Sequence, residues 1–222
     1  MPKISKEILI TVGLIALDVL VVYFHLRYGG TIALFNIDKE RSFNAIISST
    51  QFLFIGIFAS LHTILLYALK STWRRITPWA LLGAGCIYFA VDDLFEIHER
   101  LGVMLNKVFS LGGFWGESFN WLIYFAPFLL IGAYMLYFVA RDICKASRMQ
   151  TLGIGLGLCF FIAALGLEYY EGIILVTGSQ PMKLYHTLLL FEEFFELLGA
   201  SFILTGIFSY VSKQIRKHVH VS

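Results

Sequence analysis

Six apolar windows recur along this chain, and each has roughly the 18 to 25 residues needed to cross about 30 Å of hydrocarbon. The windows lie near residues 7–27, 45–69, 78–98, 119–140, 152–176 and 184–211. Hydrophobic residues make up 58% of the chain and charged residues only 14%, a balance that lies outside the range of soluble globular domains. The sequence therefore predicts an all-α integral membrane protein, in which residues 1–222 form a single domain, a bundle of six transmembrane helices.

The positive side chains predict how this bundle is oriented. Of the Lys and Arg residues, eleven lie at window ends that would share one side of the membrane, and six lie on the other side. The larger set is Lys3, Lys6, Lys70, Arg74, Arg75, Arg141, Lys145, Arg148, Lys213, Arg216 and Lys217, and the smaller set is Arg27, Lys39, Arg41, Arg100, Lys107 and Lys183. The positive-inside rule places both termini in the cytoplasm. The expected location is the inner or plasma membrane of a bacterial or archaeal cell.

Charge and cysteine usage narrow the expected partners. The net charge is only +2 and there is no long basic run, which argues against nucleic-acid binding. The three cysteines lack CxxC spacing, so neither a disulfide framework nor a thiolate zinc site is supported. The expected partners are membrane lipid and a homo-oligomer or larger membrane complex, with no nucleic acid. In the fifth window, Gly153, Gly155 and Gly157 offer a small-residue face for close helix packing.

The segment VDDLFEIHER, residues 91–100, places acidic side chains where the third predicted helix reaches the outer surface. On one continuous helix, Asp92, Glu96 and Glu99 fall within about 60° of one another. His98 points to a different side and is the weaker ligand candidate. The loop after this helix, residues 100–118, is rich in apolar residues and is expected to lie on the outer interface or to fold back over the bundle.

Two further predicted helices carry acids at a similar depth. Glu168 and Glu171 lie one turn apart at the outer end of the fifth helix. The sixth helix aligns His186 with Glu193 two turns later, and Glu196 lies about 60° away. Each charge in this part of the bilayer costs about 2.5 to 3.5 kcal/mol, so such residues normally face the bundle interior and have a partner.

The acids of these three helices outnumber the nearby bases. They are Asp92, Asp93, Glu96, Glu99, Glu168, Glu171, Glu192, Glu193 and Glu196, and the bases are Arg100, Lys107 and Lys183. Ion pairs could neutralise three acids, and the other six must be protonated, hydrated or bound to a metal. Carboxylates with an imidazole suit iron, manganese, zinc, magnesium or calcium, so a divalent metal is the expected cofactor, without a choice among these. The candidate ligands are Asp92, Glu96, Glu99, Glu168, Glu171, His186, Glu193 and Glu196.

The stretch FNIDKERSFNAIISSTQF, followed by DDLFEIHERLG, resembles a group of uncharacterised small bacterial multi-helix membrane proteins. That group shares an FNxD-type outward loop and an acidic run with His and Glu at the end of the third helix. The resemblance covers roughly the first 105 residues. It implies a multi-helix membrane fold and no particular activity.

Three functions fit the acidic residues. The first is a metal-dependent enzyme with a site open to the outer leaflet, acting on a lipid-like substrate, with no catalytic residue assigned. The second is a cation or proton transporter or channel that uses the same carboxylates, with Asp18 and His62 continuing a polar route through the inner half. The third is an accessory subunit of a membrane complex. A polar path across the inner half would favour transport, although Asp18 and His62 fit equally well as satisfied interhelical hydrogen bonds.

Overall fold

The computed structural model describes residues 6–37, 39, 42–95, 97–109, 121–145, 148–177 and 181–219. Throughout these residues the regular structure is helical, with no strand, which confirms the all-α prediction. The elements are α1 (Lys6–Tyr28), η1 (Ala33–Phe35), α2 (Phe43–Ala68), α3 (Trp73–Phe95), α4 (Ile97–Phe109), α5 (Trp121–Cys144), α6 (Arg148–Thr177) and α7 (Met182–Val219).

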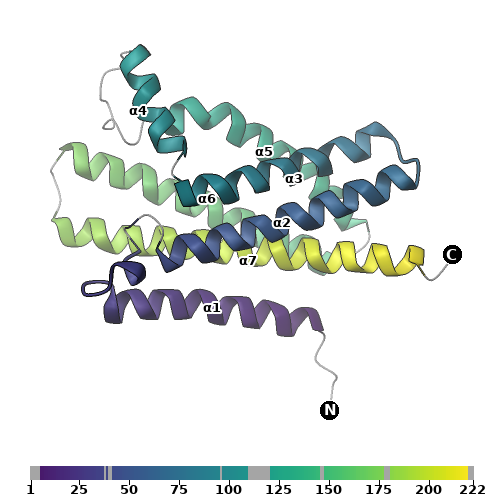
Figure 1. The fold of residues 1–222 in the computed structure, drawn as a ribbon, viewed down its shortest axis with the longest axis horizontal. Coiled ribbons are helices and arrows are strands. Elements are labelled where there is room, and N and C mark those ends of the chain that lie inside the picture. Colours follow the sequence, from purple (N-terminus) through teal and green to yellow (C-terminus); the bar gives the residue numbers. More distant parts are fainter. Residues whose placement is uncertain are drawn as a thin grey trace.

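Among the described residues, six of the α-helices, all except α4, are long and apolar enough to cross a membrane by length and composition. They agree closely with the six windows of the sequence. The long helices lie side by side, with the start of α1 and the end of α7 at one end of the bundle (Figure 1). We call this end the terminal end. The opposite end, where α3 and α6 finish and α7 begins, is called the acidic end.

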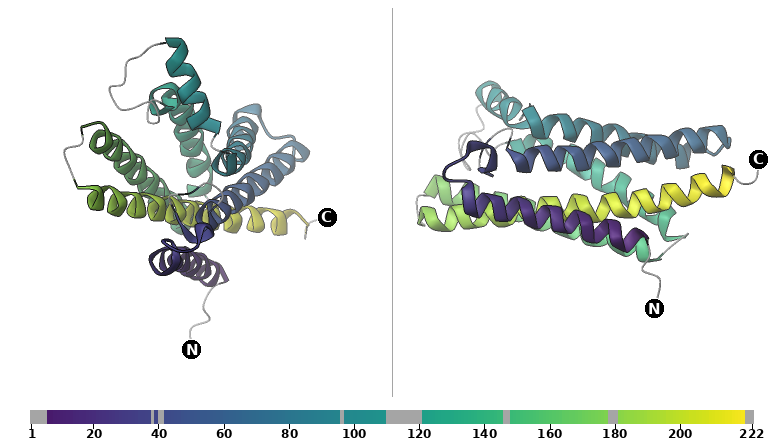
Figure 2. Two further views of the ribbon diagram at one scale, coloured as in Figure 1. Left: turned by 60° about the vertical axis from the view of Figure 1, so that its left-hand side comes forward. Right: turned by 60° about the horizontal axis from the view of Figure 1, so that its bottom comes forward.

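The last helix, α7, is the centre of the bundle. It packs against α1, α2 and α6, and the right view of Figure 2 shows α1 running beside it. Within its apolar window 72% of the residues are buried, compared with 11% for α1. The buried core of the terminal half gathers side chains from five helices, including Ile55, Trp79, Val139, Ile154 and Ile207. Most residues in this window of α7 therefore face other helices.

The contact between α6 and α7 depends on two glycines. A methyl group placed on Gly157 would lie 2.7 Å from the carbonyl oxygen of Gly199, and one on Gly199 would lie 3.0 Å from the carbonyl oxygen of Gly157. Small residues at such a position let two helix backbones approach closely. Of the other glycines on the predicted face, Gly153 would make only ordinary contact and Gly155 has open space beside it. Of the three glycines on the predicted face, Gly157 is therefore the one that makes the close contact with α7.

The end of α3 differs from the sequence prediction. A continuous helix was expected to residue 98, but α3 ends at Phe95 and α4 starts at Ile97. The 23 residues of α3 already measure about 34 Å, which is enough to cross the hydrocarbon, so the charged amphipathic segment that follows is free to form its own helix. Asp92 therefore belongs to α3 and Glu99 to α4, and the first part of the expected loop 100–118 is helical. Glu96 and the side chain of Glu99 lie outside the described residues.

Candidate functional site

At the acidic end, α3, α6 and α7 bring carboxyl groups within electrostatic range of one another. The carboxyl of Glu193 interacts with those of Asp93, Glu168 and Glu171. Its neighbour Glu192 interacts with Glu193, Glu196, Glu168 and Glu171. The side chains of Glu171 and Glu192 are buried, so this cluster points into the bundle rather than toward its surroundings. Carboxyl groups are therefore concentrated between three helices.

The remaining predicted ligands are placed less favourably for a shared metal. Asp92 is buried, and its Oδ1 lies 3.5 Å from the hydroxyl of Tyr88 on the same helix. His186 is exposed, and its ring packs beside Tyr185. Among the described residues, no three or more His, Cys, Asp and Glu side chains form a group that could hold a metal ion. The divalent metal site stays a prediction, since Glu96 and the side chain of Glu99 fall outside that description.

A polar partner of the cluster comes from α2, a helix that the sequence analysis left out of the site. Ser42 caps α2, because its Oγ accepts a hydrogen bond of 3.2 Å from the backbone nitrogen of Ala45. The cap sets the first turn, in which Nδ2 of Asn44 donates a hydrogen bond to Oε2 of Glu193. Asn44, Ser48 and Gln51 are all buried and lie one turn apart on α2. In the sequence, this polar face within an apolar run was the pattern that could have indicated the contribution of α2 to the site.

Asp18 lies near the middle of α1 and is fully buried. Nε2 of Gln51 donates to its Oδ1 at 2.9 Å, and Oγ of Ser201 donates to its Oδ2 at 2.7 Å. The amide and the hydroxyl are themselves 3.1 Å apart. One carboxyl group thus joins α1, α2 and α7 through hydrogen bonds at mid-bundle.

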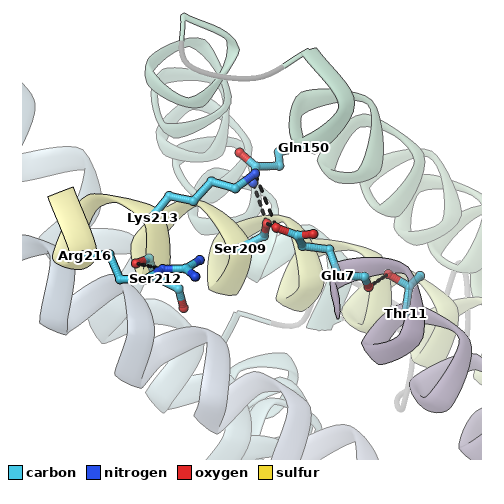
Figure 3. A network of polar contacts seen from close by, with 7 residues as sticks. All are labelled: Glu7, Thr11, Gln150, Ser209, Ser212, Lys213 and Arg216. Atoms are coloured by element: carbon cyan, nitrogen blue, oxygen red, sulfur yellow. Dashed lines mark hydrogen bonds and ion pairs between the residues drawn. The ribbon is translucent and has the colours of Figure 1, made fainter. Parts of the chain in front are cut away.

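A second polar group joins α1, α6 and α7 nearer the terminal end (Figure 3). Nε2 of Gln150 donates to Oγ of Ser209 at 2.5 Å, and that hydroxyl lies 3.4 Å from Oε1 of Glu7, to which it donates. The same carboxylate oxygen is 3.4 Å from Nζ of Lys213. Glu7 therefore has both a hydroxyl and a cation as partners.

These groups form one line along α7. Between the two hydrogen-bonded groups, Thr205 is buried, and its hydroxyl donates to the carbonyl oxygen of Ser201 at 2.9 Å. From Glu193 to Ser209 the line runs about 24 Å along the helix, most of the thickness of a hydrocarbon core. We call it the polar column; its members are Glu7, Asp18, Asn44, Ser48, Gln51, Gln150, Glu193, Ser201, Thr205 and Ser209.

Four buried oxygen atoms of the polar column have no hydrogen-bond partner among the described residues: Asn44 Oδ1, Ser48 Oγ, Gln51 Oε1 and Gln150 Oε1. The amides of Asn44, Gln51 and Gln150 turn their nitrogen atoms toward carboxylate or hydroxyl partners. A carboxylate, or a hydroxyl that already donates its proton elsewhere, can only accept a hydrogen bond. Leaving such an atom buried and unsatisfied costs about 1 to 3 kcal/mol, and bound water is the usual partner of buried polar groups. The column thus offers acceptors for water along its length.

His62, the other residue expected on a polar route, does not join these hydrogen bonds. Its buried ring packs edge-on against Trp79, with centroids 4.3 Å apart, and against Tyr210 at 5.2 Å. Within the described part of the chain, neither ring nitrogen has a hydrogen-bond partner. Nearby, Arg75 forms a 3.0 Å ion pair with Asp142. His62 is therefore part of the aromatic packing beside the column.

A family model described as a domain of unknown function (DUF8692) matches residues 8–210. The chain matches no curated protein and no solved structure.

Proposed function

The chain belongs to this family of unknown function, and we propose from its own residues that it moves protons across a membrane along the polar column. In this proposal the six long helices span the membrane with both termini in the cytoplasm. Protons pass between the acidic end outside and Glu7 at the terminal end inside. Transport was the second of the functions drawn from the sequence, and a polar path through the other half of the bundle is the feature that favours it.

The observation that carries the proposal is Asp18. A carboxyl group at this depth is costly to insert, and such residues usually mark a proton or ion route or a structural ion pair. The partners that Asp18 has among the described residues are neutral donors, the amide of Gln51 and the hydroxyl of Ser201. Among the described residues, no lysine or arginine forms an ion pair with Asp18. Asp18 can therefore take up and release a proton without breaking a salt bridge.

The same hydrogen bonds favour a proton over a metal cation as the transported ion. A sodium or calcium ion needs oxygen lone pairs directed at it. At Asp18, Gln51 presents an N–H group and Ser201 presents an O–H group toward the carboxylate oxygens. A proton instead binds a carboxylate oxygen directly, and only the direction of one hydrogen bond has to change.

Transfer along the column would use groups that can both donate and accept. Carboxyl and hydroxyl groups do so, and water bound at the four unpartnered oxygens would link them. At each step one O–H bond breaks as the next forms. The acidic cluster would raise the local proton concentration at the entrance. Thr205 is the sparsest step, since its hydroxyl points to the Ser201 carbonyl and must rotate to pass a proton on.

A second candidate is a metal-dependent enzyme acting on a lipid-like substrate at the acidic end. It is favoured by the gathering of carboxyl groups from α3, α6 and α7 around Glu193. A divalent metal there would supply a Lewis acid or an activated water. In this candidate Glu193 would be one ligand, although the described residues Glu168, Glu171 and Glu193 as placed do not form a group that could hold a metal ion.

One preparation separates the two candidates. The purified protein is analysed for bound metals and reconstituted into liposomes that contain a pH-sensitive dye. Proton transport predicts a dye response to an imposed membrane potential that empty liposomes do not give, with no matching flux of sodium. A stoichiometric divalent metal that is lost in Glu193→Gln, in a protein that moves no protons, would instead support the enzyme and contradict transport.

A further inference from the structure

At the terminal end, a pocket of about 370 Å³ opens between the start of α1 and the end of α7. Its walls combine basic, acidic, hydroxyl and apolar side chains. They are Lys6, Glu7, Ile10, Phe208, Ser209, Ser212, Ile215 and Arg216. A volume of this size is ample for a phosphate group and the glycerol attached to it.

The charges at this pocket leave a net positive balance. The carboxylate of Glu7 is already paired with Lys213 at 3.4 Å and receives the hydroxyl of Ser209. In the described part of the chain, neither Lys6 nor Arg216 forms an ion pair. The two basic side chains are therefore available to an anion that enters the pocket.

The guanidinium of Arg216 is held in place while its outer nitrogens stay available. Its Nε donates to the carbonyl oxygen of Ser212 at 3.2 Å, one turn earlier on α7 (Figure 3). This bond uses one of five N–H groups and fixes the stem of the side chain. The fork that remains matches a phosphate, which accepts two parallel hydrogen bonds from arginine.

We propose that this pocket binds an anionic phospholipid, with Lys6 and Arg216 holding the phosphate of its headgroup. The hydroxyl of Ser212 lies in the same wall and can donate to a phosphate oxygen. The apolar side chains Ile10, Phe208 and Ile215 would contact the glycerol and the first acyl carbons. Basic pockets between membrane helices are the usual sites for such headgroups. This site does not depend on proton transport.

The apolar walls distinguish a lipid from a free phosphate ion, which shares the same headgroup chemistry. A free ion would contact only the basic and hydroxyl groups, whereas a lipid also covers Ile10, Phe208 and Ile215. The position of the pocket also fits a lipid headgroup. Lys6 is the first residue of α1 and Arg216 lies in the last turn of α7, so both basic side chains stand at the ends of long apolar helices.

The test is lipid binding to the detergent-purified full chain, measured by native mass spectrometry with phosphatidylglycerol and, separately, phosphatidylcholine. Lys6→Gln and Arg216→Gln are each expected to weaken phosphatidylglycerol binding about 5-fold, and the double variant about 30-fold. Lys217→Gln is the matched control, since Lys217 is exposed, carries the same charge one residue along α7, and does not line the pocket. Lys217→Gln should change phosphatidylglycerol binding less than about 2-fold, because an exposed charge outside the pocket contributes little.

Three results would overturn the proposal. They are equal losses in Lys217→Gln and Arg216→Gln, equal binding of phosphatidylcholine by the wild type, and displacement of phosphatidylglycerol by inorganic phosphate at millimolar concentration, which would indicate a free-ion site. Arg216→Lys keeps the charge but loses the fork, so it should weaken phosphatidylglycerol binding less than Arg216→Gln does. The thermal midpoint of the double variant in phosphatidylcholine should equal that of the wild type, which separates a lost site from a lost fold.

Discussion

Replacing Asp18 with asparagine is expected to lower the rate of proton movement in proteoliposomes by about 100-fold or more, the scale on which a positioned proton-transfer group contributes. Asparagine keeps the size of the side chain but cannot take up a proton at neutral pH. One of the two donors, Gln51 or Ser201, would also face an amide N–H, which costs about 1 to 2 kcal/mol of stability. Dye-loaded liposomes measure the rate, and thermal unfolding in detergent measures the stability.

Asp142→Asn provides the matched control. Asp142 is also a carboxyl within a long apolar helix, but it is paired with Arg75 and is not a member of the polar column. This variant should lose stability and keep the wild-type proton flux. Equal flux in Asp18→Asn and the wild type, with both proteins folded, would remove Asp18 from the route.

Adding a methyl group to Gly157 is expected to destabilise the fold by about 1 to 3 kcal/mol, the usual cost of overpacking a tight contact. The new carbon would stand 2.7 Å from the Gly199 carbonyl oxygen, which is backbone and cannot rotate away. α6 and α7 would have to separate, although alanine favours a helix more than glycine does. Chemical denaturation in mild detergent measures the change in the free energy of unfolding.

Gly155→Ala, two residues away on α6, isolates the contact from the helix propensity. Nothing lies near the added methyl group at this position, so the variant should be neutral or more stable by up to about 1 kcal/mol. The two substitutions are chemically identical, and opposite signs are expected. A Gly157→Ala variant as stable as Gly155→Ala would show that α6 and α7 do not approach closely at Gly157.

The bundle itself could be predicted from the sequence, because the thickness of hydrocarbon sets the length of each apolar window. The windows and the six long helices agree within a few residues at most ends. The break after Phe95 could not be predicted in this way, since the segment VDDLFEIHER contains neither proline nor glycine. Helical periodicity continued across this segment, so the sequence predicted one helix where the structure has α3 and α4.

The candidate site was predictable only in part, because period and depth do not say which helices are neighbours. Glu168, Glu171 and Glu193 were chosen from their spacing, whereas Asp93 was not chosen as a ligand and Asn44 was not considered. For Asp18, the sequence could not distinguish a structural hydrogen-bonded residue from a residue on a transport route. Its partners Gln51 and Ser201 come from helices distant in the chain, so only the packing of α1, α2 and α7 identifies them.

The central claim is that protons follow the polar column, and the most direct test is the flux of Thr205→Val beside that of Thr187→Val. Both threonines lie on α7, and both donate a 2.9 Å hydrogen bond to the carbonyl oxygen four residues earlier. Thr205 is the buried step between Ser201 and Ser209, whereas Thr187 is exposed. The account predicts about a tenfold lower flux for Thr205→Val, which corresponds to about 1.4 kcal/mol, and wild-type flux for Thr187→Val. Equal fluxes in the two variants would contradict it.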